Sequence, residues 1–453
     1  MGNITLRQAA AWCGGRVEEK YADVTFLGAN NDSRKLLPGQ LFLALRGERD
    51  GHDFIPMAME KGAAAVLCSR KCGDYPAIIV EDPRKALGDI ARQERLRIGM
   101  KVVGVTGSVG KSTTKEMIAA VLGSTYRVEK TPVNQNNDIG MPMAILSMPA
   151  DTQVAVLEMG MNHFREIAYL SGIARPDVAV IVNIGTMHIE HLGSREGILK
   201  AKMEILEGMG EDGCVILNGD DDMLWSRRGQ KGLKATYFGA NNPEAAVRAT
   251  QVEQKENLLC FAVETETGSF PVELNLEGRH YVPDALAAVC VGLALGVAPD
   301  QIRKNLWLFR NMEGRQEIFE AKGCTIIKDC YNAGPESMQA ALEVLGNRPG
   351  SHVAVLGDML ELGDRTQAEH YRLGRIAAEK ADILLAYGPN SGRVVSGART
   401  GGMSDAKAMA FADRDKIIAA LKRLAKPGDV VLFKGSRGMR MELVLEGFLK
   451  DET

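Results

Sequence analysis

The sequence lacks an excess of basic residues. Its 55 Lys and Arg are nearly balanced by 58 Asp and Glu, which leaves a formal net charge of −3, and no basic tract is present. Proteins that bind nucleic acid or an anionic membrane surface usually carry such a tract or patch. We therefore expect no nucleic-acid partner for this chain.

The sequence also lacks an apolar run long enough to span a bilayer. The longest, Ala285–Ala298, falls short of the roughly 20 residues that a transmembrane helix needs, and it predicts a buried helix instead. The opening residues MGNITLRQAA show neither the charged nor the apolar region of a secretion signal, and they predict the capped start of a short helix. We expect no membrane insertion and a cytoplasmic location.

Cysteines are few and do not have the paired spacing of a zinc site. Eight occur in the chain, and Cys68 and Cys72 have no matching second pair. We interpret these scattered cysteines as reduced thiols of a cytoplasmic protein. We expect no structural zinc.

The length of 453 residues exceeds the size at which one hydrophobic core usually keeps growing, so two or three domains are expected. Apolar runs and turn residues divide the chain into three blocks, 1–82, 83–313 and 314–453. The first has strand-like runs at 39–47 and 63–69 with a helical pattern between them. It predicts a small α/β domain.

The two later blocks alternate strand-like and helix-like patterns. The apolar strand-like runs lie at 101–107, 154–160, 177–185, 213–219, 324–330, 352–358, 382–388 and 429–436. This alternation predicts a parallel sheet covered on both faces in the central block, with a β-rich interlude near 258–274. The third block predicts a second, doubly wound, Rossmann-like sheet. Ligands of such sheets bind beyond the carboxyl ends of the strands.

Residues 105–117, VTGSVGKSTTKEM, lie between a strand-like run and a helix-like stretch. A phosphate-binding loop needs glycines where backbone N–H groups approach the anion, a lysine for the β and γ phosphates, and a hydroxyl for Mg²⁺. The usual pattern has a glycine where Val105 stands, so a plain glycine-rich turn is the alternative. We predict a nucleotide-binding P-loop at Gly107, Ser108, Val109, Gly110, Lys111, Ser112 and Thr113.

Two later strand ends carry side chains that suit a metal. Glu158 ends one strand-like run, where its carboxylate is a candidate Mg²⁺ ligand, and His188 follows another. Taken singly, Glu158 could instead be a solvated surface charge, and His188 could be a structural histidine that binds no metal. P-loops serve motors, switches, kinases and ligases, so the loop alone does not name the reaction.

Taken together, these residues resemble the Mur ligases, most closely the MurF branch. The segments that carry the likeness span nearly the whole chain: 32–54, TGSVGKS at 106–112, KTPVNQNNDIGMP at 130–142, LEMGMNH at 157–163, NIGTMHIEHLGS at 183–194, DCYNAGPESM at 329–338, LGDMLELG at 356–363 and FKGSRGMRME at 433–442. The short T-G-x-x-G-K-[ST] form is the family's own version of the P-loop.

The resemblance implies an ATP-dependent, ADP-forming ligase. It would join UDP-N-acetylmuramoyl-tripeptide to D-alanyl-D-alanine through an acyl phosphate, in peptidoglycan precursor synthesis. Block 1–82 would bind the UDP-sugar, block 83–313 would bind ATP, and block 314–453 would bind the dipeptide. The resemblance implies these small molecules as partners, and we expect a monomer.

The resemblance also implies two Mg²⁺ ions. Ser112 and Glu158 would hold one, and His188 and Lys202 would contribute to the second. A lysine ammonium cannot ligate a metal, and the family solves this by carbamylating the lysine with CO₂. Carbamylation is therefore expected at Lys202, whose spacing from His188 matches the family, and not at the nearby Lys200.

Further roles follow from the resemblance. Lys111 and Arg315 would act on the γ-phosphate, and Lys111, Lys202, His188 and Arg315 form the expected catalytic set. Asp329 and Asn332 would contact the nucleotide. The expected substrate contacts are Ser33 for UDP, Asn134, Asn136 and Asn137 in the asparagine-rich segment, and Asp358 and Arg437 for the dipeptide, whose carboxylate suits a guanidinium.

The chain departs from the family at the segment associated with the nucleotide base. Tyr281 and Asp284 stand where the family usually has asparagines. An ionised aspartate only accepts hydrogen bonds, so either the pocket compensates or nucleotide preference is relaxed. The alternatives are a Mur ligase that adds a single amino acid, a non-catalytic nucleotide-binding paralogue and, last, a generic P-loop ATPase.

Overall fold

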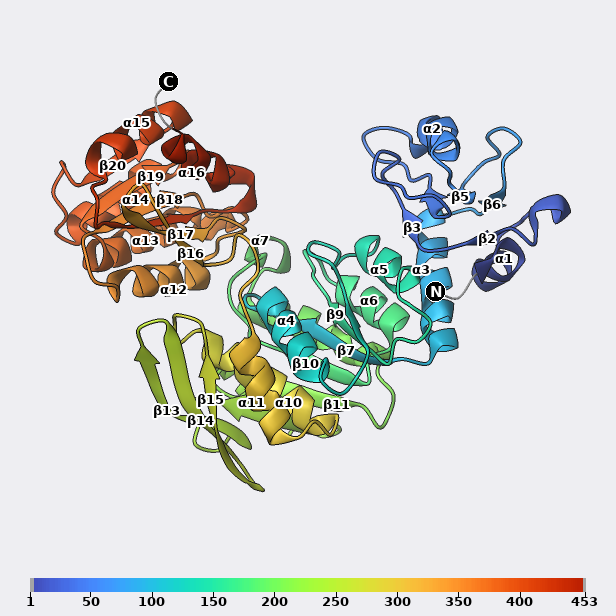
Figure 1. Cartoon of the computed structure of the whole chain (residues 1–453), viewed down its shortest axis with the longest axis horizontal. Helices are drawn as coiled ribbons and strands as arrows, with labels where there is room; N and C mark the ends of the chain where they lie inside the picture. The colour runs from blue at the N-terminus through green and yellow to red at the C-terminus, as the bar shows by residue number, and fades with distance from the viewer. Residues whose placement is uncertain (1–3, 451–453) are drawn as a thin grey trace.

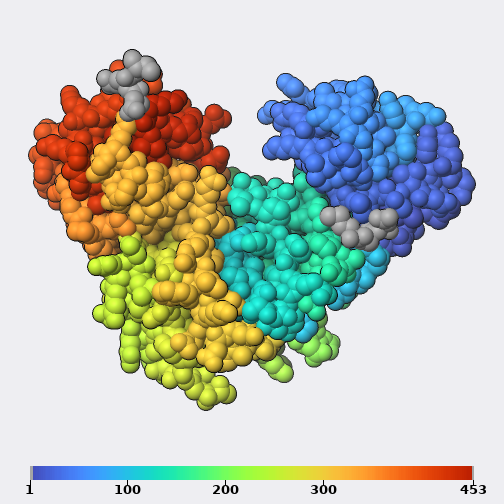
Figure 2. All heavy atoms as spheres, in the orientation of Figure 1, coloured from blue at the N-terminus to red at the C-terminus, as the bar shows by residue number. Residues whose placement is uncertain are grey.

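Three α/β units follow one another along the chain in the computed structural model, which describes residues 4–450. The N-terminal and C-terminal units lie on the same side of the central one (Figure 1). A space-filling view shows a wide hollow between these two outer units (Figure 2). Within residues 4–450, no helix combines the length and the apolar character needed to cross a bilayer. All eight cysteines are free thiols.

The N-terminal unit is the small α/β domain that the sequence predicted. Its four-stranded parallel sheet has the order β3-β4-β5-β6. Its elements are β1 (Ile4–Thr5), α1 (Leu6–Cys13), η1 (Glu19–Tyr21), β2 (Thr25–Phe26), β3 (Ala29–Asn30), β4 (Leu41–Leu43), η2 (Gly51–Phe54), α2 (Ile55–Glu60), β5 (Ala65–Cys68) and β6 (Ala77–Ile79). Thr5 caps α1, as predicted, by accepting a hydrogen bond from the backbone N–H of Gln8; residues 1–3 of that predicted start lie outside the described chain.

Helix α3 (Pro83–Ile98) joins the N-terminal and central units. It begins directly after Asp82, whose carboxylate caps it, and it ends at Gly99 in the left-handed conformation. The apolar face of α3 is buried in a core to which both units contribute. The helix therefore starts at the predicted boundary of 82/83 and packs against both of its neighbours.

The central unit contains a nine-stranded sheet in the order β15-β14-β13-β12-β11-β10-β7-β9-β8. All neighbours from β8 to β13 are parallel, whereas β14 and β15 pair antiparallel. The strands are β7 (Lys101–Thr106), β8 (Val128–Lys130), β9 (Val154–Glu158), β10 (Val178–Ile181), β11 (Cys214–Asn218), β12 (Ala235–Gly239), β13 (Val247–Lys255), β14 (Leu258–Thr265) and β15 (Gly268–Leu274). The predicted parallel sheet and its β-rich extension are thus confirmed.

Helices cover both faces of the central sheet. The helices of this unit are α4 (Lys111–Leu122), α5 (Gly140–Leu146), α6 (Glu166–Ala174), α7 (Ile189–Leu192), α8 (Arg195–Met203), η3 (Glu204–Gly208), α9 (Asp222–Trp225), α10 (Tyr281–Ala294) and α11 (Pro299–Leu308). Strand β7 shows why both faces must be covered, because Val102 is buried in one core and Val103 and Val105 in another. The predicted apolar helix is α10, and it packs on α4 behind the P-loop.

The C-terminal unit is the predicted doubly wound sheet. Its strand order is β16-β17-β21-β18-β19-β20, and only the edge strand β16 is antiparallel to its neighbour. Its elements are β16 (Glu317–Ala321), β17 (Cys324–Asp329), α12 (Pro335–Gly346), β18 (His352–Gly357), η4 (Gly363–Arg365), α13 (Thr366–Lys380), β19 (Ile383–Tyr387), α14 (Ser391–Thr400), β20 (Ala408–Phe411), α15 (Arg414–Leu424), β21 (Val430–Lys434), η5 (Arg437–Met439) and α16 (Met441–Leu449). The paired strands β17 and β21 end together at Asp329 and Lys434.

Candidate functional site

A cavity of about 570 Å³ lies between the central and C-terminal units. The P-loop and the carboxyl end of β9 form one side, and the ends of β17 and β21 with the start of α12 form the other. The predicted residues that line it are Ser108, Val109, Gly110, Lys111, Ser112, Thr113, Asn136, Asn137, Glu158, His188, Arg315, Asp329 and Asn332. The cavity thus collects most of the site that the sequence predicted.

The P-loop connects β7 to α4 through a tight turn. Gly110 has a φ of 83°, and a Cβ at this position would lie 2.5 Å from Oδ1 of Asp284. Glycine is required here because both the left-handed backbone and the close approach exclude a side chain. Lys111 folds back, and its Nζ donates to the carbonyl oxygens of Gly107 and Ser108 at 2.8 and 3.1 Å.

A hydroxyl and a carboxylate meet at the start of α4. The hydroxyl of Ser112 donates to Oε2 of Glu158 at 2.7 Å, and Asn136 donates to Oε1 of the same carboxylate at 2.9 Å. Arg315, from the third block, donates to the Ser112 hydroxyl at 2.9 Å. Two hard oxygen donors beside a phosphate-binding loop suit Mg²⁺.

Lys202 lies directly beneath the P-loop. It is 2% exposed, and its Nζ donates to the carbonyl oxygen of Gly107 at 2.9 Å. Burial lowers the pKa of Lys202 well below its usual value, and the nearby charge of Lys111 lowers it further. In the chain between residues 4 and 450, no carboxylate forms an ion pair with this amine. Burial therefore favours the neutral amine over the ammonium at this position.

His188 lies at the start of α7, between the two units. Its backbone is left-handed, with a φ of 62°, and its Nδ1 lies 2.8 Å from Oε2 of Glu361, although the two atoms are poorly aligned for a hydrogen bond. Burial lowers the pKa of His188 to about 4, the charge of Lys111 acts in the same direction, and Glu361 opposes them. A neutral imidazole offers a lone pair to a metal.

The C-terminal side of the cavity contributes an ion pair and a stacked guanidinium. Lys434 donates to Oδ2 of Asp329 at 2.5 Å and to the carbonyl oxygen of Asn332 at 3.2 Å. The guanidinium of Arg315 lies over the ring of Tyr331, 4.0 Å from its centroid. These contacts hold Asp329 and Arg315 in fixed positions at the cavity.

The two residues that depart from the family pattern also line the cavity. The carboxylate of Asp284 accepts a hydrogen bond of 2.7 Å from the hydroxyl of Thr114, and burial raises its pKa to about 7. The hydroxyl of Tyr281 accepts a hydrogen bond of 2.5 Å from the side-chain amide of Asn311. Both side chains are therefore already paired within the protein.

Four predicted substrate residues, all within the described chain, do not line this cavity: Ser33, Asn134, Asp358 and Arg437. Ser33 lies in the N-terminal unit, where its hydroxyl contacts the sulfur of Met57. Asn134 accepts a hydrogen bond from the hydroxyl of Tyr331, across the two units. Ser33 and Asn134 therefore lie outside the cavity at the P-loop.

Asp358 and Arg437 lie at the ends of strands in the C-terminal unit. Asp358 is 1% exposed, and its carboxylate accepts hydrogen bonds from the backbone and side chain of Asn390. This pairing ties the end of β18 to the start of α14. Arg437 is exposed and pairs with Glu442 at 3.1 Å. Of the two, only Arg437 offers its charged group to solvent.

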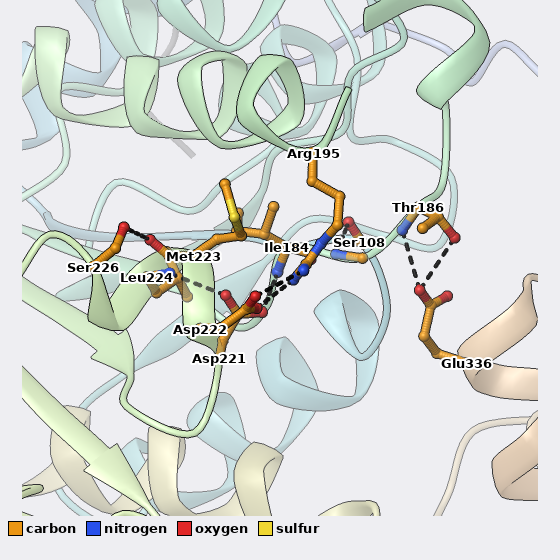
Figure 3. A network of polar contacts seen from close by, with 11 residues as sticks. Ser108, Ile184, Thr186, Arg195, Asp221, Asp222, Met223, Leu224, Ser226 and Glu336 are labelled. Carbon is orange, nitrogen blue, oxygen red and sulfur yellow. Dashed lines mark hydrogen bonds and ion pairs between the residues drawn. The ribbon is translucent and has the colours of Figure 1, made fainter. Parts of the chain in front are cut away.

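The structure adds residues that the sequence reasoning did not single out. The side-chain oxygen of Asn183 accepts hydrogen bonds from the backbone N–H groups of Ser108 and Val109 and so holds the P-loop. Glu336, on α12, contacts Thr186 across the two units (Figure 3). Asn183 lies two positions after the end of β10, so its place close to a strand end was a usable signal. Nothing in the local pattern marked Glu336.

Within residues 4–450, no three His, Cys, Asp or Glu side chains gather as a metal cluster. A divalent ion here would take most of its ligands from phosphates and water, which is how Mg²⁺ commonly binds beside nucleotides. The hydroxyl and carboxylate of Ser112 and Glu158 fit that arrangement. The donor set suits a nucleotide-bound Mg²⁺ and does not suit a cage built by the protein alone.

Three family models match successive parts of the chain. They are the Mur ligase family catalytic domain over residues 23–95, the Mur ligase middle domain over 105–292, and the Mur ligase glutamate ligase domain over 314–437. A UDP-N-acetylmuramoyl-tripeptide–D-alanyl-D-alanine ligase of Bacillus subtilis (strain 168) is 39% identical over 440 residues, which cover 95% of each chain.

Solved structures give the same result. The chain is similar to a crystal structure of MurF from Acinetobacter baumannii, with a TM-score of 0.92 and 34% identity over 100% of both chains. It is also similar to the MurF ligase from Thermotoga maritima in complex with ADP, with a TM-score of 0.83 and 33% identity. That match covers 93% of this chain and 97% of the other.

Proposed function

This chain belongs to the Mur ligase family, and we propose that it is an ATP-dependent ligase that joins UDP-N-acetylmuramoyl-tripeptide to D-alanyl-D-alanine and releases ADP and phosphate. The product serves peptidoglycan synthesis. The observation that carries the proposal is the contact of Ser112 with both Glu158 and Arg315, because it brings groups from two units to one phosphate-binding loop.

ATP binds in the cavity between the central and C-terminal units. The P-loop receives the phosphates, and Lys111 leaves its backbone partners to reach the β and γ phosphates. Asp329 and Asn332 contact the nucleotide from the C-terminal side. The Thermotoga maritima relative, solved with ADP, supports a nucleotide in this family's fold.

Two Mg²⁺ ions accompany the nucleotide, and when bound they neutralise phosphate charge at the reacting oxygens. Ser112 and Glu158 would hold one ion, and His188 and a carbamylated Lys202 would hold the other. Carbamylation requires a neutral amine, which attacks CO₂ and loses a proton to give an anionic carbamate. The lowered pKa and the burial of Lys202 support this modification.

The reaction begins at the carboxylate of the tripeptide. This carboxylate attacks the γ-phosphorus of ATP, the bond to the bridging oxygen breaks, and ADP leaves an acyl phosphate behind. Lys111 and Arg315 place positive charge where the anionic groups must converge. The amine of the dipeptide then attacks the acyl carbon, phosphate departs, and the amine loses a proton as the peptide bond forms.

The substrates bind to different units. Ser33 lies in the N-terminal unit that receives the UDP group, whereas Asn136 and Asn137 line the cavity beside the P-loop and Asn134 bonds to Tyr331 of the C-terminal unit. The exposed guanidinium of Arg437 pairs with the free carboxylate of the dipeptide. Asp358 supports the dipeptide site through the loop that it holds at Asn390. The hollow in Figure 2 separates the two outer units, so catalysis requires domain closure.

A single-amino-acid ligase of the same family and a non-catalytic paralogue are the alternatives. The asparagine-rich segment at 130–142 and LGDMLELG at 356–363 argue against the first, because both resemble the MurF branch of the family. The assembled contacts of Ser112, Lys202 and Arg315 argue against the second, because a protein that only binds nucleotide does not need this set. We expect the protein to act as a cytoplasmic monomer.

Mass spectrometry of one reaction tests the proposal. The purified protein is incubated with ATP, Mg²⁺, UDP-N-acetylmuramoyl-tripeptide and D-alanyl-D-alanine, and the expected product is the UDP-linked pentapeptide. Parallel reactions replace the dipeptide by single amino acids, and a relative of known activity serves as positive control. Absence of the pentapeptide where the control makes it would overturn the proposal, and a tetrapeptide would favour the single-amino-acid alternative.

A further inference from the structure

Residues 183–188, between β10 and α7, form a segment that we call the β10–α7 loop. Its first residue, Asn183, accepts hydrogen bonds from the backbone N–H groups of Ser108 and Val109 at 3.0 and 2.9 Å. The backbone N–H of Gly185 then donates to the hydroxyl of Ser108 at 2.9 Å. The position of this loop therefore sets the position of the P-loop.

The first half of the loop is anchored within the central unit (Figure 3). The backbone N–H of Ile184 donates to Oδ2 of Asp221 at 2.7 Å, and its carbonyl oxygen accepts from Arg195 at 2.8 Å. Arg195 is in turn paired with Asp222 at 2.6 Å. These contacts involve no residue of the C-terminal unit, so the anchoring is independent of how that unit docks.

The second half of the loop is contacted by the C-terminal unit. Oε1 of Glu336, in the first turn of α12, accepts hydrogen bonds from both the backbone N–H and the hydroxyl of Thr186, each at 3.1 Å (Figure 3). The approach is close, because a Cβ on Gly185 would lie 2.8 Å from the same oxygen. His188, two residues beyond Thr186, lies beside Glu361 of the C-terminal unit.

Only one oxygen of the Glu336 carboxylate, Oε1, takes part in the contact with Thr186. Oε2 of Glu336 is buried and has no hydrogen-bond partner among residues 4–450. A buried polar atom without a partner costs free energy, so this half-paired carboxylate lowers the stability that the two hydrogen bonds to Thr186 contribute. We therefore look for the role of the Glu336–Thr186 contact in the reaction, where the position of Thr186 matters.

We propose that Glu336 is a positioning residue for ligation: by holding Thr186, it transmits docking of the C-terminal unit to His188 and to the P-loop. The effect acts through the β10–α7 loop, because the same short segment bonds to Ser108 at one end and carries His188 at the other. This inference rests on the proposed function, since it assigns Glu336 a part in that reaction.

Kinetics of two variants at Glu336 test the role. Glu336→Ala removes both hydrogen bonds and is expected to lower kcat about tenfold, the factor that corresponds to about 1.4 kcal/mol of lost interaction. Glu336→Gln keeps an acceptor oxygen and is expected to restore most of the rate. Glu336 also lines the cavity, so the dissociation constant for ADP separates positioning from direct contact with the nucleotide. A change of less than about twofold is expected because Asn183 still holds the P-loop backbone, and a large loss of ADP affinity would overturn the positioning role.

A matched control and a double variant separate positioning from folding. Glu343→Ala, at an exposed glutamate of the same helix, is expected to keep the parent rate. Thr186→Val removes one of the two donors, and its loss is expected to disappear when Glu336 is already alanine. Additive losses, or a fall in kcat that merely follows a fall in thermal stability, would overturn the proposal.

Amide hydrogen exchange tests the same contact without relying on activity. In the intact protein without nucleotide, peptides covering residues 183–188 are expected to exchange faster in Glu336→Ala than in the parent or in Glu343→Ala. Unchanged exchange would contradict the proposal even if the pentapeptide forms. Faster exchange in a protein that makes no pentapeptide would leave the contact established and place the failure with the proposed function.

Discussion

The guanidinium of Arg315 donates a hydrogen bond of 2.9 Å to the hydroxyl of Ser112, although 203 positions separate the two residues in sequence. The same hydroxyl donates to Glu158. A cation from the C-terminal unit thus meets the P-loop at the expected metal site. Because the site is complete only when both units contribute, its chemistry depends on how they dock.

Arg315→Ala is expected to lower kcat by about a hundredfold, because it removes a positive charge from the site where phosphate and carboxylate charges converge. Initial rates of ADP release, measured with all three substrates, check this. Arg310→Ala is the matched control, since within residues 4–450 the Arg310 side chain donates to the carbonyl oxygens of Trp307 and Phe309, away from the P-loop. Equal rates in the two variants would remove Arg315 from the catalytic set.

Lys111→Ala is expected to abolish turnover while the fold remains intact. Burial lowers the pKa of Lys111, Glu158 opposes this shift, and Arg315 adds to it, so the charged amine is disfavoured in the folded protein and its removal is expected to leave the fold intact. Circular dichroism and thermal unfolding check the fold, and pentapeptide formation checks turnover. A variant that still ligates at the parent rate would contradict the role given to Lys111.

Lys202→Ala is expected to lose activity and to regain part of it when short-chain carboxylic acids are added, because their carboxylates replace the carbamate. The matched control is Lys200→Ala, since Lys200 is exposed and packs over the ring of Phe164. It is expected to keep the parent rate without supplement. Full activity of unsupplemented Lys202→Ala would exclude carbamylation as a requirement.

Asp284 is expected to make stability depend on pH. Burial raises its pKa in the folded protein to about 7, from a usual value of 3.8, and the hydrogen bond from Thr114 opposes the shift. Between these two values the folded state binds more protons than the unfolded state, so this contribution to stability falls as the pH rises from about 4 to about 7. Above pH 7 the loss is complete.

Asp284→Asn still accepts from Thr114 but cannot ionise, so it is expected to flatten this slope and to unfold at a higher denaturant concentration at pH 8. Urea unfolding at pH 5.5 and pH 8 measures the difference. Asp300→Asn, at an exposed aspartate in the first turn of α11, is the matched control. A slope that is the same in parent and Asp284→Asn would show that Asp284 does not carry the effect.

Much of the site was predictable because its residues lie at strand ends. The P-loop, Glu158 and His188 each follow an apolar strand-like run, and parallel strands place their carboxyl ends at one edge of a sheet. The resemblance added Lys202 and Arg315, whose local surroundings carry no signal. Helix α3 shows why a boundary between units is hard to predict from sequence. It begins at Pro83, yet it packs against both the N-terminal and the central unit.

The side-chain partners were not predictable. Asp358 follows a strand, as a ligand-binding residue does, yet its carboxylate is buried against Asn390. Asp284 stands where the family usually has an asparagine associated with the nucleotide base, and its carboxylate bonds to Thr114 beneath the P-loop. In both cases a polar residue close in space, but far along the chain, satisfies the carboxylate.

The sequence by itself determined which segments become strands and helices, where the P-loop lies and to which family the chain is similar. Those properties depend on local periodicity, on turn residues and on the order of motifs along one chain. Only the tertiary structure decided that Glu336 reaches Thr186 and that Arg315 reaches Ser112. Contacts between units depend on how two separately folded surfaces meet, and no pattern within either segment encodes the distance between them.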